Sequence, residues 1–113
     1  MTDKAPVTGP LIIDALEYPN PARQWFEEWR AGGVSCVHVT VAIWENEQET
    51  MRRLALWRRA FLDHADLIEV ALTGQDITRV AASGRTAVVL GFQNTAPIEH
   101  DIELIETVPP MII

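Results

Sequence analysis

The chain has 113 residues, of which 48% are hydrophobic and 22% are charged, and its formal net charge is −7. This length predicts one domain, and this composition excludes a disordered chain. The negative charge argues against nucleic acid and against an anionic membrane as partners. No apolar run is long enough for a transmembrane helix and no signal segment opens the chain, so we expect a cytoplasmic protein. The single cysteine excludes an internal disulfide and fits that reducing compartment.

The first part of the chain predicts a strand, a helix and a second strand. Residues 11–16 form a short apolar run that is typical of a strand. Asn20 and Pro21 are a capping residue followed by a first-turn proline, so a helix is expected to begin there and to end near Ala31. The β-branched residues within 34–41 predict the second strand.

The middle of the chain predicts a run of helices. Residues 46–64 place apolar and charged side chains at helical spacing, which predicts a long amphipathic helix. Residues 66–72 are expected to continue as a further short helix. Thr73 and Asp76 resemble a capping box, so another helix is expected to open there and to end at Gly84.

A third strand, over residues 86–92, is the most informative element because it carries the polar pair Gln93-Asn94 at its end. Parallel α/β proteins place their chemistry at the carboxyl ends of strands, so this pair is a candidate site. Neither side chain can ionise, which limits the chemistry available there. An acidic helix is expected to follow over residues 95–105.

This order of elements predicts an α/β fold. Helices separate successive strands, so the three strands should be parallel, adjacent in chain order and joined by right-handed crossovers. Residues 11–108 would then form a partial (β/α)8 TIM-barrel-like domain, since a complete barrel takes about 250 residues. Residues 1–10 are expected to be a flexible segment and residues 109–113 a short apolar tail. Both outer strands would be unpaired edges, so we expect self-association or a missing C-terminal half.

Three stretches of the sequence resemble a known family. They are the run at 11–16, the turn Gly32-Gly33-Val34, and the segment from Asp76 through Gly91-Phe92-Gln93 to Leu104. Together they resemble the N-terminal part of the renal (membrane) dipeptidase family, from about Leu11 to Glu106. The resemblance implies a (β/α)8 metallohydrolase of the amidohydrolase type. Members of that family use a two-zinc site for proteolysis of dipeptides, and some act on other small amides.

The resemblance also implies which residues stand at the family's metal-binding positions. The first strand of the family ends in Asp-Gly-His-x-Asp, and here Leu16 and Tyr18 replace the histidine and the second aspartate. Gln93 stands at the position of the family's bridging glutamate. Leucine has no donor atom, and a neutral amide cannot offset the charge of a divalent ion. We therefore expect this chain to bind no metal or other cofactor and to be inactive alone.

Two further groups of residues are candidate sites. Asp14 and Glu17 lie on or just after the first strand and could form an acidic substrate-binding or vestigial cluster with the Gln93-Asn94 pair. We favour a turn cap for Asp14 and a solvated Glu17, since acidic residues are mostly exposed. Cys36 and His38 face the same side of the second strand and could be soft metal ligands. Two ligands do not make a site, so a buried cysteine and a hydrogen-bonded histidine are favoured.

Two functions therefore remain open. The first is an enzyme of the metallopeptidase type, of which this chain is the N-terminal portion and which is active only with its missing half. The second is a metal-free binding or self-associating domain derived from that family. The ligand positions favour the second function for the isolated chain, while the resemblance favours the first as a family label.

Overall fold

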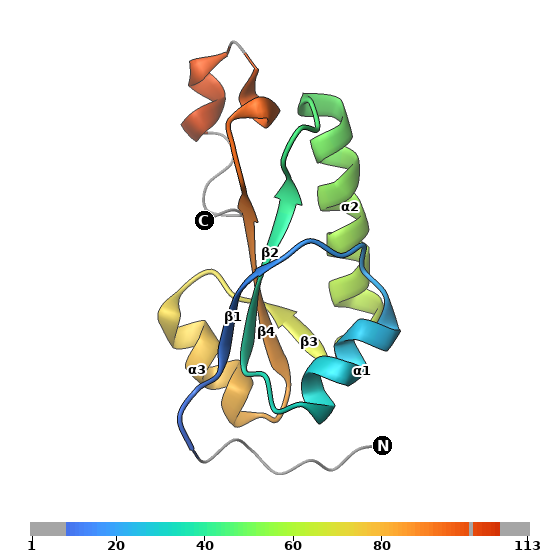
Figure 1. Cartoon of the computed structure of the whole chain (residues 1–113), viewed down its shortest axis with the longest axis vertical. Helices are drawn as coiled ribbons and strands as arrows, with labels where there is room; N and C mark the ends of the chain where they lie inside the picture. Colours follow the sequence, from blue (N-terminus) through green and yellow to red (C-terminus); the bar gives the residue numbers. More distant parts are fainter. Residues whose placement is uncertain (1–8, 100, 107–113) are drawn as a thin grey trace.

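The structure is a computed structural model and describes residues 9–99 and 101–106 (Figure 1). In chain order its elements are β1 (Ile13–Glu17), α1 (Arg23–Ala31), β2 (Cys36–Ala42), α2 (Glu47–Asp63), β3 (Ile68–Val70), α3 (Gly74–Ala82) and β4 (Thr86–Phe92), followed by two 3-10 helices, η1 (Ala96–Ile98) and η2 (Ile102–Glu106). Among these residues, no helix is both long and apolar enough to cross a bilayer.

Four strands form one sheet in the order β1-β2-β4-β3, and every neighbouring pair is parallel. The three predicted strands are β1, β2 and β4, and they lie side by side in chain order. The predicted parallel α/β fold is therefore confirmed. The register of β2 and β4 runs from Cys36 opposite Ala87 to Ala42 opposite Phe92. Both central strands are buried on both faces over most of their length, as parallel sheets generally are.

The expected helix over residues 66–72 is wrong, because this segment contains β3. Ile68 and Val70 pair with Thr86 and Val88 of β4. Their β-branched side chains suit a strand, but a short apolar run has no period that separates a strand from a helix. The sheet consequently has four strands instead of three, and β4 is covered at its beginning.

Charged side chains hold β3 at the edge of the sheet. Glu69 of β3 accepts hydrogen bonds from Arg79 of α3 at 2.5 Å and from Arg85, just before β4, at 2.8 Å. Arg79 above all, and Arg85 after it, hold the pKa of the Glu69 carboxyl below its ordinary value. These ion pairs connect β3 to the two elements that follow it in the chain.

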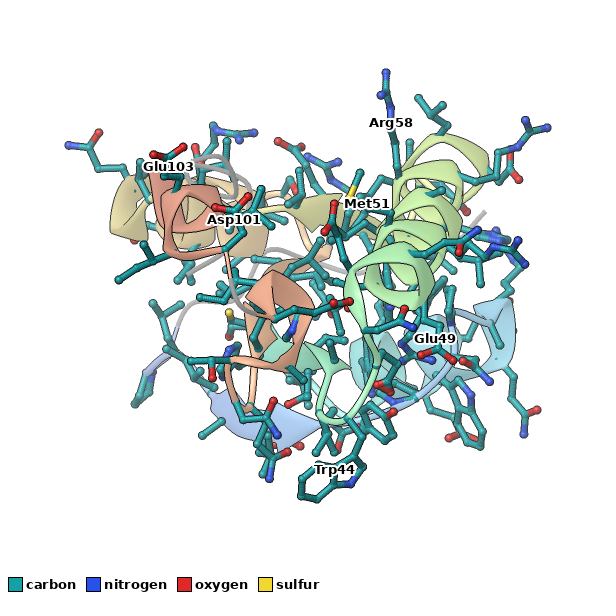
Figure 2. The ribbon with its side chains drawn as sticks, turned by 90° about the horizontal axis from the view of Figure 1, so that it is seen from above. Trp44, Glu49, Met51, Arg58, Asp101 and Glu103 are labelled. Carbon is teal, nitrogen blue, oxygen red and sulfur yellow. The ribbon has the colours of Figure 1, made fainter. Side chains whose placement is uncertain are left out.

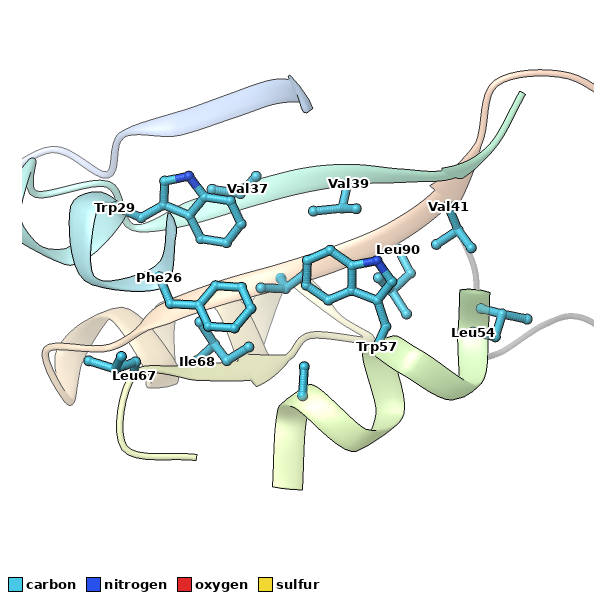
Figure 3. Close-up of a cluster of buried hydrophobic side chains, with 12 residues drawn as sticks. Phe26, Trp29, Val37, Val39, Val41, Leu54, Trp57, Leu67, Ile68 and Leu90 are labelled. Atoms are coloured by element: carbon cyan, nitrogen blue, oxygen red, sulfur yellow. The ribbon is translucent and has the colours of Figure 1, made fainter. Parts of the chain in front are cut away.

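Helices cover both faces of the sheet. α1 and α2 pack on the face that carries Val37, Val39 and Leu90, around the buried rings of Phe26 and Trp57 (Figure 3). α3 packs on the opposite face, in a smaller cluster made of Cys36, Ala71, Val80 and Ala87. Because β3 lies beyond β4, the connection from β3 to β4 runs back across the sheet, opposite to the connection from β1 to β2. A right-handed crossover then places α3 on the other face.

Two helices begin with capping boxes, of which the second was predicted. Asn46 and Glu49 form a capping box at the start of α2, which ends at Asp63, close to the predicted bounds. The predicted box of Thr73 and Asp76 opens α3, with hydrogen bonds in both directions. In each box the side chains satisfy backbone N–H groups that the first helical turn leaves free.

The first helix begins later than predicted. α1 starts at Arg23, after Ala22, whose side chain makes no cap, and the predicted start at Asn20-Pro21 is wrong. The Asn20 amide oxygen instead accepts a hydrogen bond from the Arg53 guanidinium at 2.9 Å. A partner distant in sequence has therefore taken the side chain that the local pattern assigned to the cap.

The acidic helix predicted over residues 95–105 is replaced by η1 and η2. Glu99, which follows η1, has a φ of 50°, in the left-handed region that interrupts a right-handed helix. Residues 1–8 of the expected flexible segment and the expected tail over 109–113 lie outside the described residues, so these two expectations stay predictions.

Candidate functional site

The candidate site lies at the carboxyl edge of the sheet, which we define as the residues that follow β1, β2 and β4: 18–20, 43–46 and 93–95. Figure 2 views the molecule from above, toward this edge, with Trp44 projecting away from the ribbon. The Trp44 side chain is 82% exposed. Loops at this end of parallel strands are the usual position of binding and catalytic residues.

A polar network joins the segment after β1 to α2 and the segment after β2. The Tyr18 hydroxyl donates a hydrogen bond to the Glu45 carboxylate. The Arg53 guanidinium lies over the Tyr18 ring, 4.9 Å from its centroid. Arg53 also donates to the carbonyl of Val41 and, as noted above, to the amide oxygen of Asn20. One arginine of α2 therefore ties together the ends of two neighbouring strands.

The hydrogen bonds of this network favour the charged form of Glu45 and the neutral form of Tyr18. The hydrogen bond from Tyr18 lowers the pKa of the Glu45 carboxyl, and a backbone N–H from Ile43, at 3.1 Å, acts in the same direction. The same hydrogen bond raises the pKa of the Tyr18 hydroxyl. Tyr18 and Glu45 are 27 residues apart, and no local pattern links them. Sequence reasoning consequently missed the network, although Tyr18 itself stood at a ligand position of the resemblance.

Gln93 and Asn94 follow β4 and have different environments. The Asn94 amide oxygen accepts a hydrogen bond from the Ala96 N–H at 2.8 Å, so it supports the turn into η1. The Gln93 backbone N–H donates to the Ala42 carbonyl at 2.9 Å. Its side chain is exposed and has no hydrogen-bond partner among the described residues. Phe92 packs toward α2, so the strand alternation directs Gln93 to the opposite face.

Asp14 and Glu17 lie together on β1, on the face covered by α1. Burial first, and then the neighbouring Asp14 carboxyl, raise the pKa of Glu17, while a hydrogen bond with Trp29 acts in the opposite direction. One carboxylate oxygen of Asp14 accepts the Leu16 N–H at 3.1 Å. A register irregularity between Asp14 and Glu17 places both on the same face.

The two candidate pairs are not brought together. Glu17 lies opposite Val39 of β2, whereas Gln93 bonds to Ala42, three residues farther along the same strand. Strand β2 also lies between β1 and β4. The four residues therefore do not form one acidic or amide cluster across the edge of the sheet.

Cys36 and His38 are both accounted for by the packing of β2. Cys36 is 1% exposed, and burial raises the pKa of its thiol. The His38 Nδ1 lies 2.9 Å from the Ala15 carbonyl, which links β2 to β1. Within the described part of the chain, no three His, Cys, Asp or Glu side chains are grouped so that they could hold a metal ion.

The zinc site that the resemblance implies does not fit the residues at its positions. Leu16 has no donor atom and is 56% exposed. The Tyr18 hydroxyl is engaged with Glu45, and Gln93 offers only a neutral amide. Zinc in proteins is bound by thiolate, imidazole and carboxylate groups, and none of these three side chains supplies one.

Two apolar cavities lie beside α2 and were not predicted. The first has a volume of about 160 Å³ and is lined by Leu54, Arg58, Phe61, Val70, Leu72 and Leu90. The second has a volume of about 200 Å³ and lies between the beginning of α2, the end of β4 and the 3-10 helices. Leu54 lines both cavities. The sequence does not indicate these cavities, because they depend on how α2 packs against β3 and the 3-10 helices, which were not predicted.

Comparison with known proteins identifies the kind of fold. Neither a family model nor a curated protein sequence matches the chain. Among solved structures, an amidohydrolase from Pseudomonas aeruginosa is similar, with a TM-score of 0.83 and 30% identity over 86% of this chain and 30% of that chain. The probable dipeptidase PvdM from Pseudomonas aeruginosa has a TM-score of 0.69 and 15% identity, over 90% of this chain and 33% of that one. The second likeness shows the fold alone.

These neighbours are TIM-barrel-type proteins, and this chain spans about a third of their length. The partial-barrel architecture predicted from the sequence is thereby confirmed. The chain resembles renal-dipeptidase-like amidohydrolases over that third of their length, as the sequence motifs predicted.

Proposed function

We propose that this chain is a metal-free, non-catalytic segment of a dipeptidase-like amidohydrolase fold, which by itself neither binds zinc tightly nor hydrolyses dipeptides. The observation that carries the proposal is the donor set at the three ligand positions. Leu16 has no donor, the Tyr18 hydroxyl is committed to Glu45, and Gln93 is a neutral amide. The likeness to solved hydrolases supports the fold of the segment, and the donor set argues against their chemistry in this chain.

The physical basis is the charge that a metal site requires. A divalent ion between two sites is held by anionic oxygen or by imidazole, and the bound ion lowers the pKa of its water toward neutrality. Without the ion, no group at the carboxyl edge generates hydroxide at neutral pH. Any hydrolysis would then depend on residues in the region that the solved neighbours have beyond the third matched here. The free thiol of Cys36 supports a cytoplasmic location as part of this proposal.

Metal analysis of the purified chain tests the proposal directly. After incubation with zinc and dialysis, we expect much less than one zinc per chain and no turnover of a dipeptide. Stoichiometric zinc that resists dialysis would contradict the proposal, and measurable turnover would contradict it more strongly. If zinc is retained, comparing Glu17→Gln with Gln93→Ala would locate it, because the structure separates these two residues by a strand.

A restored variant provides the matched control. The triple substitution Leu16→His, Tyr18→Asp, Gln93→Glu introduces imidazole and carboxylate at the three positions, while the triple alanine variant introduces none. We expect the first variant to retain more zinc than the second and than the natural chain. Equal retention by all three chains would mean that these positions do not control metal binding.

A further inference from the structure

The outer edge of β4 is open beyond the end of β3. Strand β3 pairs only with the first residues of β4, and the last bond between them joins the Ala71 N–H to the Val88 carbonyl at 2.8 Å. The N–H groups of Ala87 and Gln93 point toward β2. By alternation, those of Leu90 and Phe92 point away from β2, and no backbone group of the described residues accepts them. Among the residues 9–99 and 101–106, the end of β4 is therefore an unpaired strand edge.

An apolar cavity lies beside this open edge. It is the cavity of about 160 Å³ between α2, β3 and β4, and its lining is apolar except for Arg58 at one side. A cavity of about 150 Å³ with an aliphatic and aromatic lining stays dry and accepts a benzene-sized group. A branched aliphatic side chain of an added strand would fill such a space.

The opposite edge of the same sheet offers a matching strand. β1 pairs with β2 on one side and has no strand on its other side in the described part of the chain. The apolar residues of β1 and of the two positions before it are largely uncovered: Leu11 is 43% exposed, Ile12 54%, Ile13 53% and Leu16 56%. An open edge strand with exposed apolar side chains is a template for pairing with another strand.

We propose that β1 of a second copy of this chain adds in parallel to the open end of β4, with the side chain of Ile12, which precedes β1 and by alternation shares the face of Asp14, in the cavity. A twofold rotation about an axis along the strands keeps all strands parallel and repeats the contact on the other side. In each copy the outer edge of β1 and the open end of β4 are then paired, while the outer edge of β3 gains no partner. The contact uses main-chain hydrogen bonds for affinity and the cavity for register.

Charge favours a second copy over an unrelated apolar strand. Asp14 and Glu17 share the face of β1 that α1 covers, and in a continuous sheet this face continues as the face that carries α2. There Arg58 lines the cavity and forms no ion pair with any described residue (Figure 2 shows Arg58 projecting from α2). The two adjacent carboxyls of one copy would gain a cation that they lack in the single chain. This attraction opposes the repulsion between two chains of net charge −7.

Sedimentation velocity over a range of concentrations measures the association. We expect a dimer, with a dissociation constant raised at least about tenfold by Ile12→Lys just before β1 or by Leu72→Lys at the cavity, since each would bury an unpaired ammonium group. Leu56→Lys is the matched control: Leu56 is 54% exposed, as Ile12 is, but lines neither cavity, so the dissociation constant of this variant should be unchanged. Circular dichroism establishes that each variant is folded.

A charge exchange tests the identity of the occupant. Arg58→Glu and Glu17→Arg should each weaken the dimer, and the chain with both substitutions should regain most of the lost affinity. A monomer at every concentration overturns the proposal, as does a dimer that Ile12→Lys and Leu72→Lys leave unchanged. If the double variant loses as much dimer affinity as the two single variants together, the second copy is not the occupant. The same conclusion follows if the chain stays monomeric and instead binds an uncharged valine-rich peptide. None of these results depends on whether the chain binds zinc.

Discussion

Replacing Trp57 by phenylalanine tests how the core between α2 and the sheet is held. Trp57 is fully buried, and its ring centroid lies 5.9 Å from that of Phe26 and 6.0 Å from that of Phe61. Its indole N–H has no hydrogen-bond partner among the described residues. The substitution therefore removes apolar contact and an unsatisfied donor at the same time, and the two effects have opposite signs.

The two effects are similar in size. The lost ring leaves about 40 Å³, which costs about 1 kcal/mol at about 24 cal/mol per Å³ of cavity. Removing a buried and unpaired N–H recovers about 1–3 kcal/mol. We therefore expect Trp57→Phe to leave the free energy of unfolding unchanged or to raise it by up to about 2 kcal/mol. Trp57→Ala also loses the contacts with Phe26 and Phe61, and should lower it by about 3–5 kcal/mol.

Urea unfolding followed by far-ultraviolet circular dichroism, at one protein concentration, measures both variants. Trp44→Phe is the control, because the Trp44 side chain is 82% exposed and the same exchange there should change stability by less than about 0.5 kcal/mol. A loss of about 2 kcal/mol or more in Trp57→Phe, with a neutral Trp44→Phe, would refute the reasoning. It would mean that the indole N–H is hydrogen-bonded in solution.

Three further predictions concern other elements. The hydrogen bond from Arg79 holds the pKa of the Glu69 carboxyl below its ordinary value of 4.5. The ionised Glu69 therefore stabilises the fold fully above pH 4.5, and this stabilisation is lost as the pH falls through the lower pKa of the folded state. Glu69→Gln should consequently reduce the difference between the melting temperatures at neutral and at acidic pH. Thr73→Ala removes one half of the α3 capping box and should cost about 1 kcal/mol in urea unfolding. Gly33 has a φ of 75°, so Gly33→Ala should lower the free energy of unfolding by about 1–2 kcal/mol. Gly74 lies at the start of α3 and no atom lies near the carbon that alanine would add, so Gly74→Ala should leave the free energy of unfolding unchanged or raise it slightly. Equal effects at the two glycines would contradict the backbone explanation.

The elements that could be predicted are those with a signal of their own. β4 was predicted with its observed bounds, because residues 86–92 are apolar and lie between a helix stop and a polar loop. α2 was predicted because residues 46–64 place apolar and charged side chains at helical spacing, and α3 because Thr73 and Asp76 resemble a capping box. In these segments, local propensity and the final fold agree.

The elements that were missed depend on partners distant in sequence. β3 has only three residues, and it is a strand because Ile68 and Val70 pair with β4. Because β3 lies beyond β4, α3 packs on the face opposite to α1 and α2, and no local sequence pattern predicts this position. Asn20 was assigned to a helix cap, but Arg53 uses its side chain.

The position of Gln93 and Asn94 directly after β4 could be predicted, but the contacts at this edge of the sheet could not. The carboxyl ends of the strands could be located from the strands themselves. The pairing of Tyr18 with Glu45, and the separation of Glu17 from Gln93, depend on strand order and register instead. A one-residue difference in register changes the face to which a side chain points, so such contacts follow only once the sheet is known.

The reactivity of the buried Cys36 thiol can be used to measure local opening of the fold. It is the single cysteine, and it lies opposite Ile13 of β1 on one side and Ala87 of β4 on the other, beneath α3. A thiol reagent can reach it only when β1 or α3 leaves the sheet. The labelling rate therefore measures how often this part of the molecule opens without complete unfolding. In a dimer closed through β1, labelling would slow as the protein concentration rises, while a chain that stays monomeric would label at one rate throughout.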